Sequence, residues 1–293
     1  MSGPAEFKEK TFEKYFGFEL ARLTNITFSP DQCDERFIGF DDAFHMPWHF
    51  LRHYLPYMRN SRRRRQHGIS LKDFDFHASK VSERLPDFKF NLFVQYKRPA
   101  YVDHFNGREW SSWGRPYFRF DVTPHQQKIL ADMEAHSHGR AFVVYASAAF
   151  WMNSDLYRFS AAEKIVANTN VSNVARLVGH GRYTYDGPGT FGIGHSEPEK
   201  IESTSINQII ERGQSQKGLK FTAHIKRAAA DLKRALENEP QAMAAVDQVR
   251  IANFGNLFDE LRDSDAAAES FLYALSTVEA FSEIFDVTFY AMG

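Results

Sequence analysis

The chain contains a single cysteine, Cys33, among its 293 residues. One thiol excludes an internal disulfide and any zinc site that needs several cysteines. The first residues, Met1 to Lys8, lack the apolar core of a signal peptide. No uncharged apolar run reaches the length that spans a membrane. We therefore expect a cytoplasmic protein that does not enter a membrane.

An excess of charge of one sign is also lacking, because 36 Lys and Arg face 37 Asp and Glu, for a formal net charge of −1. A nearly neutral chain has no overall field that attracts nucleic acid, so contact with DNA must come from local basic patches. The run Arg62 to Arg65 is one candidate, with a solvated loop as the alternative. Arg108, Arg115 and Arg119 among the aromatic residues of 110–118 are another, with core packing as the alternative.

Aromatic residues are plentiful, with 28 Phe, 12 Tyr and 4 Trp, and 43% of the residues are hydrophobic. This content is ample for a packed core in one large domain or two modest ones. The composition changes near Gly179, and a tail rich in helix-forming residues follows from Ser196. We expect one domain over residues 1–195 and a helical C-terminal region over residues 196–293.

Periodicity and end signals predict the secondary structure of most of the chain. Residues 45–85 are the exception, and we interpret them as an insertion. Helices are expected over residues 7–23, 124–136, 219–237, 241–261 and 266–285, and strands over residues 36–44, 93–99, 116–122 and 140–146.

The strand Phe93-Val94-Gln95-Tyr96-Lys97-Arg98-Pro99 sets two polar side chains into an apolar run. Residues two apart on a strand share one face, so Gln95 and Lys97 are expected to project together. Burying an unpaired amide and an ammonium costs several kcal/mol, so such a strand should offer them a metal, an acid or a phosphate. The strand is either part of an active site or an edge strand with a wet polar face.

The order helix, acidic strand, Gln-x-Lys strand, helix, strand over residues 7–146 resembles the PD-(D/E)xK nuclease superfamily. It is most similar to the branch in which Gln replaces the second acid, as in Mrr-type restriction endonucleases and nuclease modules of bacterial anti-phage systems. The resemblance implies an α/β fold with a restriction-endonuclease-like mixed sheet flanked by helices. It also implies a Mg²⁺-dependent or Mn²⁺-dependent DNA endonuclease.

The resemblance assigns a role to each of four residues. Asp41 would supply the principal metal-binding carboxylate, and Gln95 a neutral carbonyl oxygen. Lys97 would hold or activate the attacking water and offset charge on the phosphate. Glu19, from the preceding helix, would bind the metal through water or hydrogen-bond the site.

The acidic strand leaves one choice open. Asp41 and Asp42 point to opposite faces of a strand, so a register error of one residue exchanges them. The spacing Gly39-x-Asp41 favours Asp41, and Glu35 is a further candidate acid. The insertion either places basic residues over the substrate or separates two strands that do not share a site.

The sequence is compatible with two functions. The first is metal-dependent DNA cleavage in antiviral defence, alone, as a homo-oligomer or with a sensor or ATPase subunit. The alternative is a non-catalytic subunit that keeps the nuclease fold and binds DNA or a protein partner.

The glycines of Gly187-x-Gly189-x-x-Gly192 match a dinucleotide fingerprint formally, but no βαβ context surrounds them. We reject this motif as a cofactor site and expect a flexible loop. His180 and His195 would be able to reach substrate from that loop.

Overall fold

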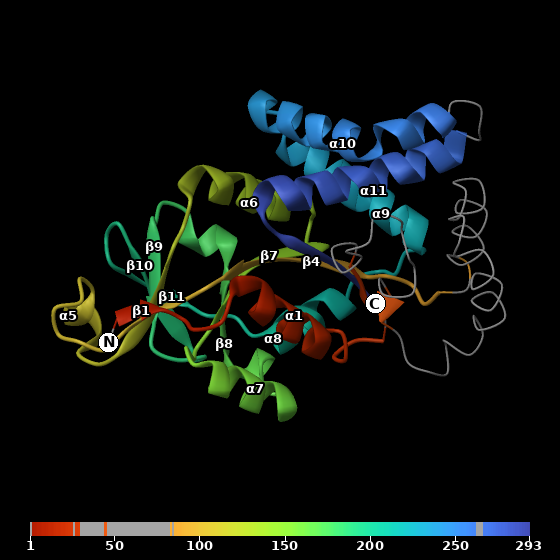
Figure 1. Cartoon of the computed structure of the whole chain (residues 1–293). Coiled ribbons are helices and arrows are strands. Elements are labelled where there is room, and N and C mark those ends of the chain that lie inside the picture. The colour runs from red at the N-terminus through yellow and green to blue at the C-terminus, as the bar shows by residue number, and fades with distance from the viewer. Residues whose placement is uncertain (1, 26, 30–43, 46–82, 84, 262–265) are drawn as a thin grey trace. The chain divides into compact units, whose positions relative to one another are not determined.

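The structure is a computed structural model that describes residues 2–25, 27–29, 44–45, 83, 85–261 and 266–293. These residues form a mixed α/β protein, as predicted (Figure 1). The chain divides into two compact units. The first unit comprises residues 1–23, 93–135 and 142–213, and the second comprises residues 24–92, 136–141 and 214–293. This division differs from the predicted domains over 1–195 and 196–293.

The first unit contains a six-stranded sheet, here called sheet A, and the helices around it. Neighbouring strands of sheet A are antiparallel throughout. In spatial order its strands are β1 (Ser2–Pro4), β5 (Ala100–Val102), β6 (Tyr117–Asp121), β9 (Arg182–Tyr185), β10 (Phe191–His195) and β11 (Glu199–Glu202). The other elements are α1 (Glu9–Leu20), α5 (Trp110–Trp113), α6 (Pro124–His136), α7 (Asn153–Ala161), α8 (Ile206–Gln214), β8 (Thr169–Asn173), most of β4 (Phe90–Lys97) and most of β7 (Ala141–Ala148).

Side chains alternate across sheet A and give it two different faces. The inner face carries aromatic rings of β6 and β9, and Phe120 lies 5.5 Å from the ring of Tyr145 on β7. Tyr185 donates a hydrogen bond to the hydroxyl of Ser147 on β7 at 2.7 Å. Sheet A thus packs its inner face against β7. The outer face carries Tyr117, Arg119, Asp121, Arg182, Thr184, Ile193 and His195.

Glycines of β10 make room for the aromatic rings of the inner face. A Cβ on Gly192 would meet the ring of Tyr183 and lie 2.6 Å from the carbonyl oxygen of Thr184. A Cβ on Gly194, in the same strand, would lie 2.7 Å from the ring of His180. These contacts explain why the strand reads Phe-Gly-Ile-Gly-His.

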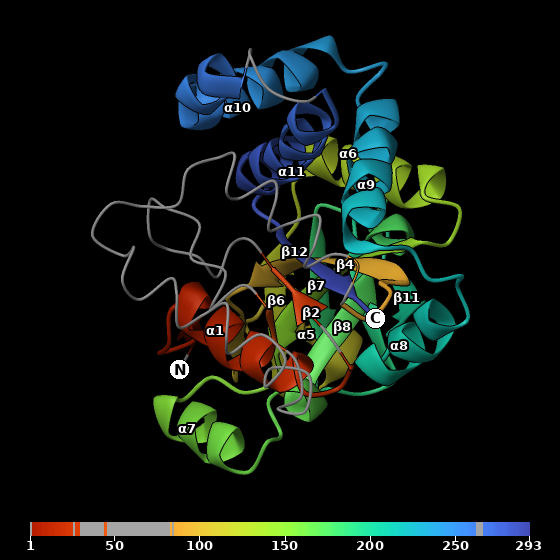
Figure 2. The ribbon, with the colours of Figure 1, turned by 90° about the vertical axis from the view of Figure 1, so that its right-hand side faces the viewer.

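The second unit combines short strands with three long helices. In spatial order its strands are β3 (Phe44–His45), β2 (Thr27–Phe28), β12 (Thr288–Met292) and the start of β4. The helices are α9 (Phe221–Ala235), α10 (Pro240–Leu261) and α11 (Ala266–Phe285), and α11 packs against both others (Figures 1 and 2). Helix α11 ends where Asp286 adopts a positive φ of 48°, after which the chain enters β12.

Several predicted elements are confirmed with nearly their expected bounds. The helix over residues 124–136 is α6, which has Pro124 at its first position, where the missing N–H is tolerated. The strand over residues 140–146 is β7, and the three C-terminal helices are α9, α10 and α11. The strand over residues 36–44 and the insertion 45–85 lie almost wholly outside the described residues.

Two expectations are confirmed only in part. The loop expected around Gly187 is the turn, residues 186–190, of the hairpin that joins β9 to β10, but Gly192 lies in β10. The tail from Ser196 is not only helical, because it contains β11 and β12. Glycines make β10 hard to recognise as a strand, and β12 is specified by its pairing with β2, which is distant in sequence.

Candidate functional site

Strand β4 places Gln95 and Lys97 on one face, as the sequence predicted. The opposite face carries Tyr96, whose ring lies 5.9 Å from Phe12 and 5.4 Å from Phe16 of α1. Since side chains alternate along a strand, Gln95 and Lys97 project away from α1. They therefore point to the side on which β7 meets sheet A.

The surroundings of Lys97 are aromatic and polar. Its Nζ lies 5.8 Å from the ring centroid of Tyr145, and the Ser147 hydroxyl donates to the Lys97 carbonyl oxygen at 3.0 Å. Burial raises the pKa of Tyr145 far above its ordinary value, so this phenol stays neutral. The Lys97 side chain is half-buried, whereas Gln95 is only 1% exposed. Lys97 is thus a cation at the border between the interior and solvent, with a buried amide two residues before it.

The structure gives Glu19 a different setting from these two residues. Glu19 lies on α1, which packs on the Tyr96 side of β4. Its carboxylate accepts a hydrogen bond from the backbone N–H of Ile165 at 2.6 Å. This contact links α1 to the segment before β8. It gives the Glu19 carboxylate a hydrogen-bonding role that does not require a metal. Asp41, together with the alternatives Asp42 and Glu35, lies outside the described residues.

In the described part of the chain, no group of three or more His, Cys, Asp or Glu side chains is arranged to hold a metal ion. Of Glu19, Gln95 and Lys97, the three expected site residues that the structure describes, it places Gln95 and Lys97 on one face of β4 and Glu19 on α1, on the other side of the strand. No helix in the same part is long and apolar enough to cross a membrane.

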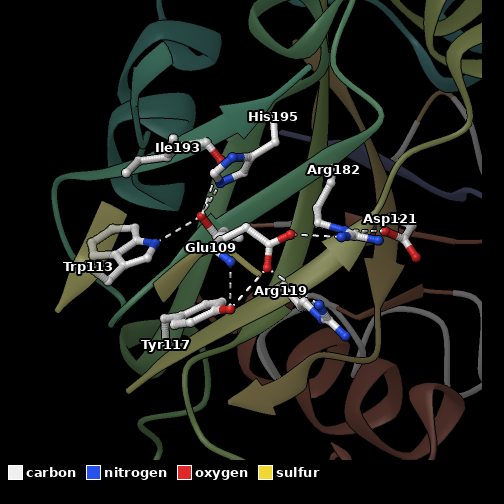
Figure 3. A network of polar contacts seen from close by, with 9 residues as sticks. Glu109, Trp113, Tyr117, Arg119, Asp121, Arg182, Ile193 and His195 are labelled. Atoms are coloured by element: carbon white, nitrogen blue, oxygen red, sulfur yellow. Dashed lines mark hydrogen bonds and ion pairs between the residues drawn. The ribbon is translucent and has the colours of Figure 1, made fainter. Parts of the chain in front are cut away.

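A second polar cluster, which the sequence analysis did not predict, covers the outer face of sheet A (Figure 3). Glu109, which precedes α5 and is 5% exposed, is its centre. Its carboxylate accepts hydrogen bonds from the Tyr117 hydroxyl at 2.9 Å and from Arg182 Nη1 at 2.7 Å, and Arg119 lies at 3.4 Å. Arg182 also donates from Nε to Asp121 at 2.7 Å. We call these five residues the Glu109 cluster.

The charges of the Glu109 cluster stabilise one another. Burial favours the neutral acid, but the hydrogen bonds from Arg182 and Tyr117 outweigh it and lower the pKa of Glu109. Hydrogen bonds to Glu109 and Asp121 raise the pKa of Arg182 in turn. Because three donors already occupy this carboxylate, Glu109 stays ionised and serves as a structural anchor between α5 and the sheet.

His195 lies beside this cluster on the same face. Its Nε2 is 2.9 Å from Thr184 Oγ1, which also accepts a hydrogen bond from Trp113 Nε1 at 2.9 Å (Figure 3). Burial, with a further effect of Arg182, lowers the pKa of His195. The imidazole is therefore neutral at pH 7. His180 is buried, and its Nε2 lies 3.5 Å from a carboxylate oxygen of Glu199.

One signal in the sequence would have revealed the Glu109 cluster. Tyr117-x-Arg119-x-Asp121 alternates with the buried rings Phe118 and Phe120, which is the period-two pattern of a strand with one polar face. Arg119 and Tyr117, which belong to the stretch expected as a candidate nucleic-acid patch, both donate hydrogen bonds to Glu109.

Comparisons of this chain with protein-family models, with curated proteins and with solved structures found no match.

Proposed function

We propose that this chain is a metal-dependent DNA endonuclease with a restriction-endonuclease-like core, acting in antiviral defence in the cytoplasm. One observation carries the proposal: Gln95 and Lys97 share a face of β4, with the ammonium at the border to solvent and the amide buried. The order of α1, β4, α6 and β7 along the chain supports it. The setting in defence rests on the family resemblance alone.

The residues would divide the work by their chemistry. Carboxylate and amide oxygens are ligands that Mg²⁺ and Mn²⁺ accept, so Asp41 and Gln95 would hold the ion. When bound, the ion neutralises charge that develops on the phosphodiester. Lys97 would orient the attacking water and stabilise the phosphate charge through its ammonium. Glu19 is left out of this set because it hydrogen-bonds Ile165.

The test is cleavage of supercoiled plasmid with Mg²⁺ or Mn²⁺, with EDTA as the metal-free control. Lys97→Ala should lower the rate at least about 100-fold, the size typical of a lost positioned catalytic group. Lys89→Ala is the matched control. Lys89 lies directly before β4, and its ammonium donates a hydrogen bond to Gln214. Asp41→Ala and Asp42→Ala, measured separately, identify the metal-binding acid. Undiminished cleavage by a folded Lys97→Ala variant would exclude Lys97 from the mechanism.

A second candidate is a non-catalytic subunit that binds DNA or a protein partner, such as a sensor or an ATPase. The 1% exposure of Gln95 favours it, because a buried amide is not directly accessible to a metal or a phosphate. Thermal unfolding separates the two functions. Stabilisation by Mg²⁺ or Mn²⁺ that is lost in Asp41→Ala supports the nuclease, and the absence of any metal response supports the binding subunit.

A further inference from the structure

Among the three long helices of the second unit, positive charge is concentrated on α9. This helix, with the sequence FTAHIKRAAADLKRA, carries four Lys or Arg residues and one acid. Helices α10 and α11 together carry one Arg and six Asp or Glu residues. In a chain whose total charge is −1, such segregation gives one helix a strong local positive potential.

The cations of α9 occupy its solvent side. The buried side of the helix consists mostly of Phe221, Ile225, Ala228, Ala229, Leu232 and Ala235. The opposite side carries the row formed by Lys226, Arg227, Lys233 and Arg234, here called the α9 cation row. Arg227 and Arg234 have side chains that are 42% and 41% exposed. Their guanidinium groups are therefore accessible to an anionic partner.

A buried acid holds two of these cations in place. Asp231, only 4% exposed, has Oδ1 at 3.2 Å from Arg227 Nε and at 3.2 Å from Arg234 Nη1. Lys233 Nζ lies 4.1 Å from the ring centroid of Tyr273 on α11. Side chains that are fixed before binding lose less conformational entropy when they contact a ligand. The row is thus pre-organised, in contrast to the mobile lysines of an ordinary solvated helix.

We propose that the α9 cation row binds the phosphate backbone of double-stranded DNA. Arg227 and Arg234 are seven residues apart, about 10 Å along the helix axis, a distance over which a duplex presents several phosphates. Ala223 and Ala230 lie on the same side of α9 as the cations. Their small side chains allow a close approach of the duplex. No aromatic or amide side chain accompanies them on this side of α9, so contact is with the backbone and not with base edges. The inference rests on the proposed function only for the choice of DNA as the partner.

The experiment measures binding of a fluorescent DNA duplex of random sequence by anisotropy, in EDTA, as the salt concentration is varied. Arg227→Gln with Arg234→Gln should weaken binding about tenfold and reduce the slope of log K against log salt by about 1.8, for two lost phosphate contacts. Arg158→Gln with Arg176→Gln is the matched control. It removes the same charge from exposed positions of the first unit and should leave the slope nearly unchanged.

Two further variants separate binding from folding. Adding Asp231→Asn to the double variant removes the buried carboxylate that would lose its partners, and the slope should stay reduced. Arg227→Lys with Arg234→Lys retains the charge and should retain the slope. An unchanged slope in both the double and the triple variant would overturn the inference. The inference would also be overturned if the double variant lost binding to anionic lipid vesicles but kept its binding to the duplex.

Cleavage and binding report on different claims. A wild-type protein that cleaves plasmid while the double variant keeps its salt slope would refute the cation row and preserve the nuclease. A wild-type protein that never cleaves, but whose slope falls in the double variant, would refute the nuclease and preserve the cation row. Wild-type protein that does not bind the duplex at any salt concentration would overturn the inference and count against the nuclease as well.

Discussion

The Glu109 carboxylate accepts a hydrogen bond from Arg182 Nη1 at 2.7 Å, and the same guanidinium donates to Asp121 at 2.7 Å. The two acids differ in their surroundings. Glu109 is 5% exposed, whereas the Asp121 side chain is 75% exposed. Removal of one partner of an ion pair costs most where solvent is excluded, because the remaining charge is then buried and unpaired.

Replacement of each acid should therefore have a different effect on stability. Glu109→Ala is expected to lower the free energy of unfolding by about 2–3 kcal/mol, because buried hydrogen bonds to a charged group are lost. Asp121→Ala is expected to lower it by less than about 1 kcal/mol, as for an exposed pair. Denaturant unfolding of both variants measures the difference. Equal losses of unfolding free energy would show that the burial of Glu109 does not make its ion pairs more important for stability than those of Asp121.

The buried side chain of His224 is expected to make the stability of the protein depend on pH. His224 Nε2 lies 2.6 Å from Asn91 Oδ1, and burial, with a smaller effect of Arg140, lowers the pKa of His224 to about 3. The unfolded histidine titrates near 6.5, so protonation favours unfolding. The contribution of His224 is complete above pH 6.5 and is lost as the pH falls toward 3, by at most about 1.4 kcal/mol per pH unit.

Comparison of variants isolates this titration. His224→Gln keeps a donor for Asn91 but has no titrating group, so its stability should decline less steeply between pH 6.5 and pH 4 than that of the wild type. His125→Gln, at an exposed position, should follow the wild-type curve. Parallel curves for the wild type and His224→Gln would contradict a neutral buried imidazole.

Two glycines of the β9–β10 hairpin form a matched pair. Gly192→Ala places a Cβ against the Tyr183 ring and 2.6 Å from the Thr184 carbonyl oxygen, and it should cost about 2–3 kcal/mol through overpacking. Gly189→Ala meets nothing within 4 Å and should change stability by less than about 0.5 kcal/mol. Thermal melting measures both, and similar melting temperatures would be inconsistent with the close packing described.

The hydrogen bond that Glu19 accepts from Ile165 indicates a structural role for this carboxylate. Glu19→Gln keeps an oxygen that accepts from the Ile165 N–H, so the melting temperature and the rate of plasmid cleavage should both stay close to wild type. Glu19→Ala loses the acceptor and should lower stability by about 1 kcal/mol. A large loss of cleavage in Glu19→Gln, with the fold intact, would return this acid to the metal site.

Local signals were enough for the elements that have their own periodicity or ends. Helix α6 was predicted over residues 124–136, and β7 as a strand over residues 140–146, from periodicity and end signals. The shared face of Gln95 and Lys97 followed from alternation along a strand. These features depend on residues close in sequence, and so the sequence by itself determined them.

The tertiary structure decided what those residues meet. Glu109 and Arg182 are 73 residues apart in sequence, and the pairing of β6 with β9 brings Arg182 to Glu109. Likewise, the packing of α1 on the Tyr96 side of β4 separates Glu19 from Gln95 and Lys97. Contacts between distant segments depend on strand order and on which face a helix covers, and neither quantity is encoded in a local stretch of the chain.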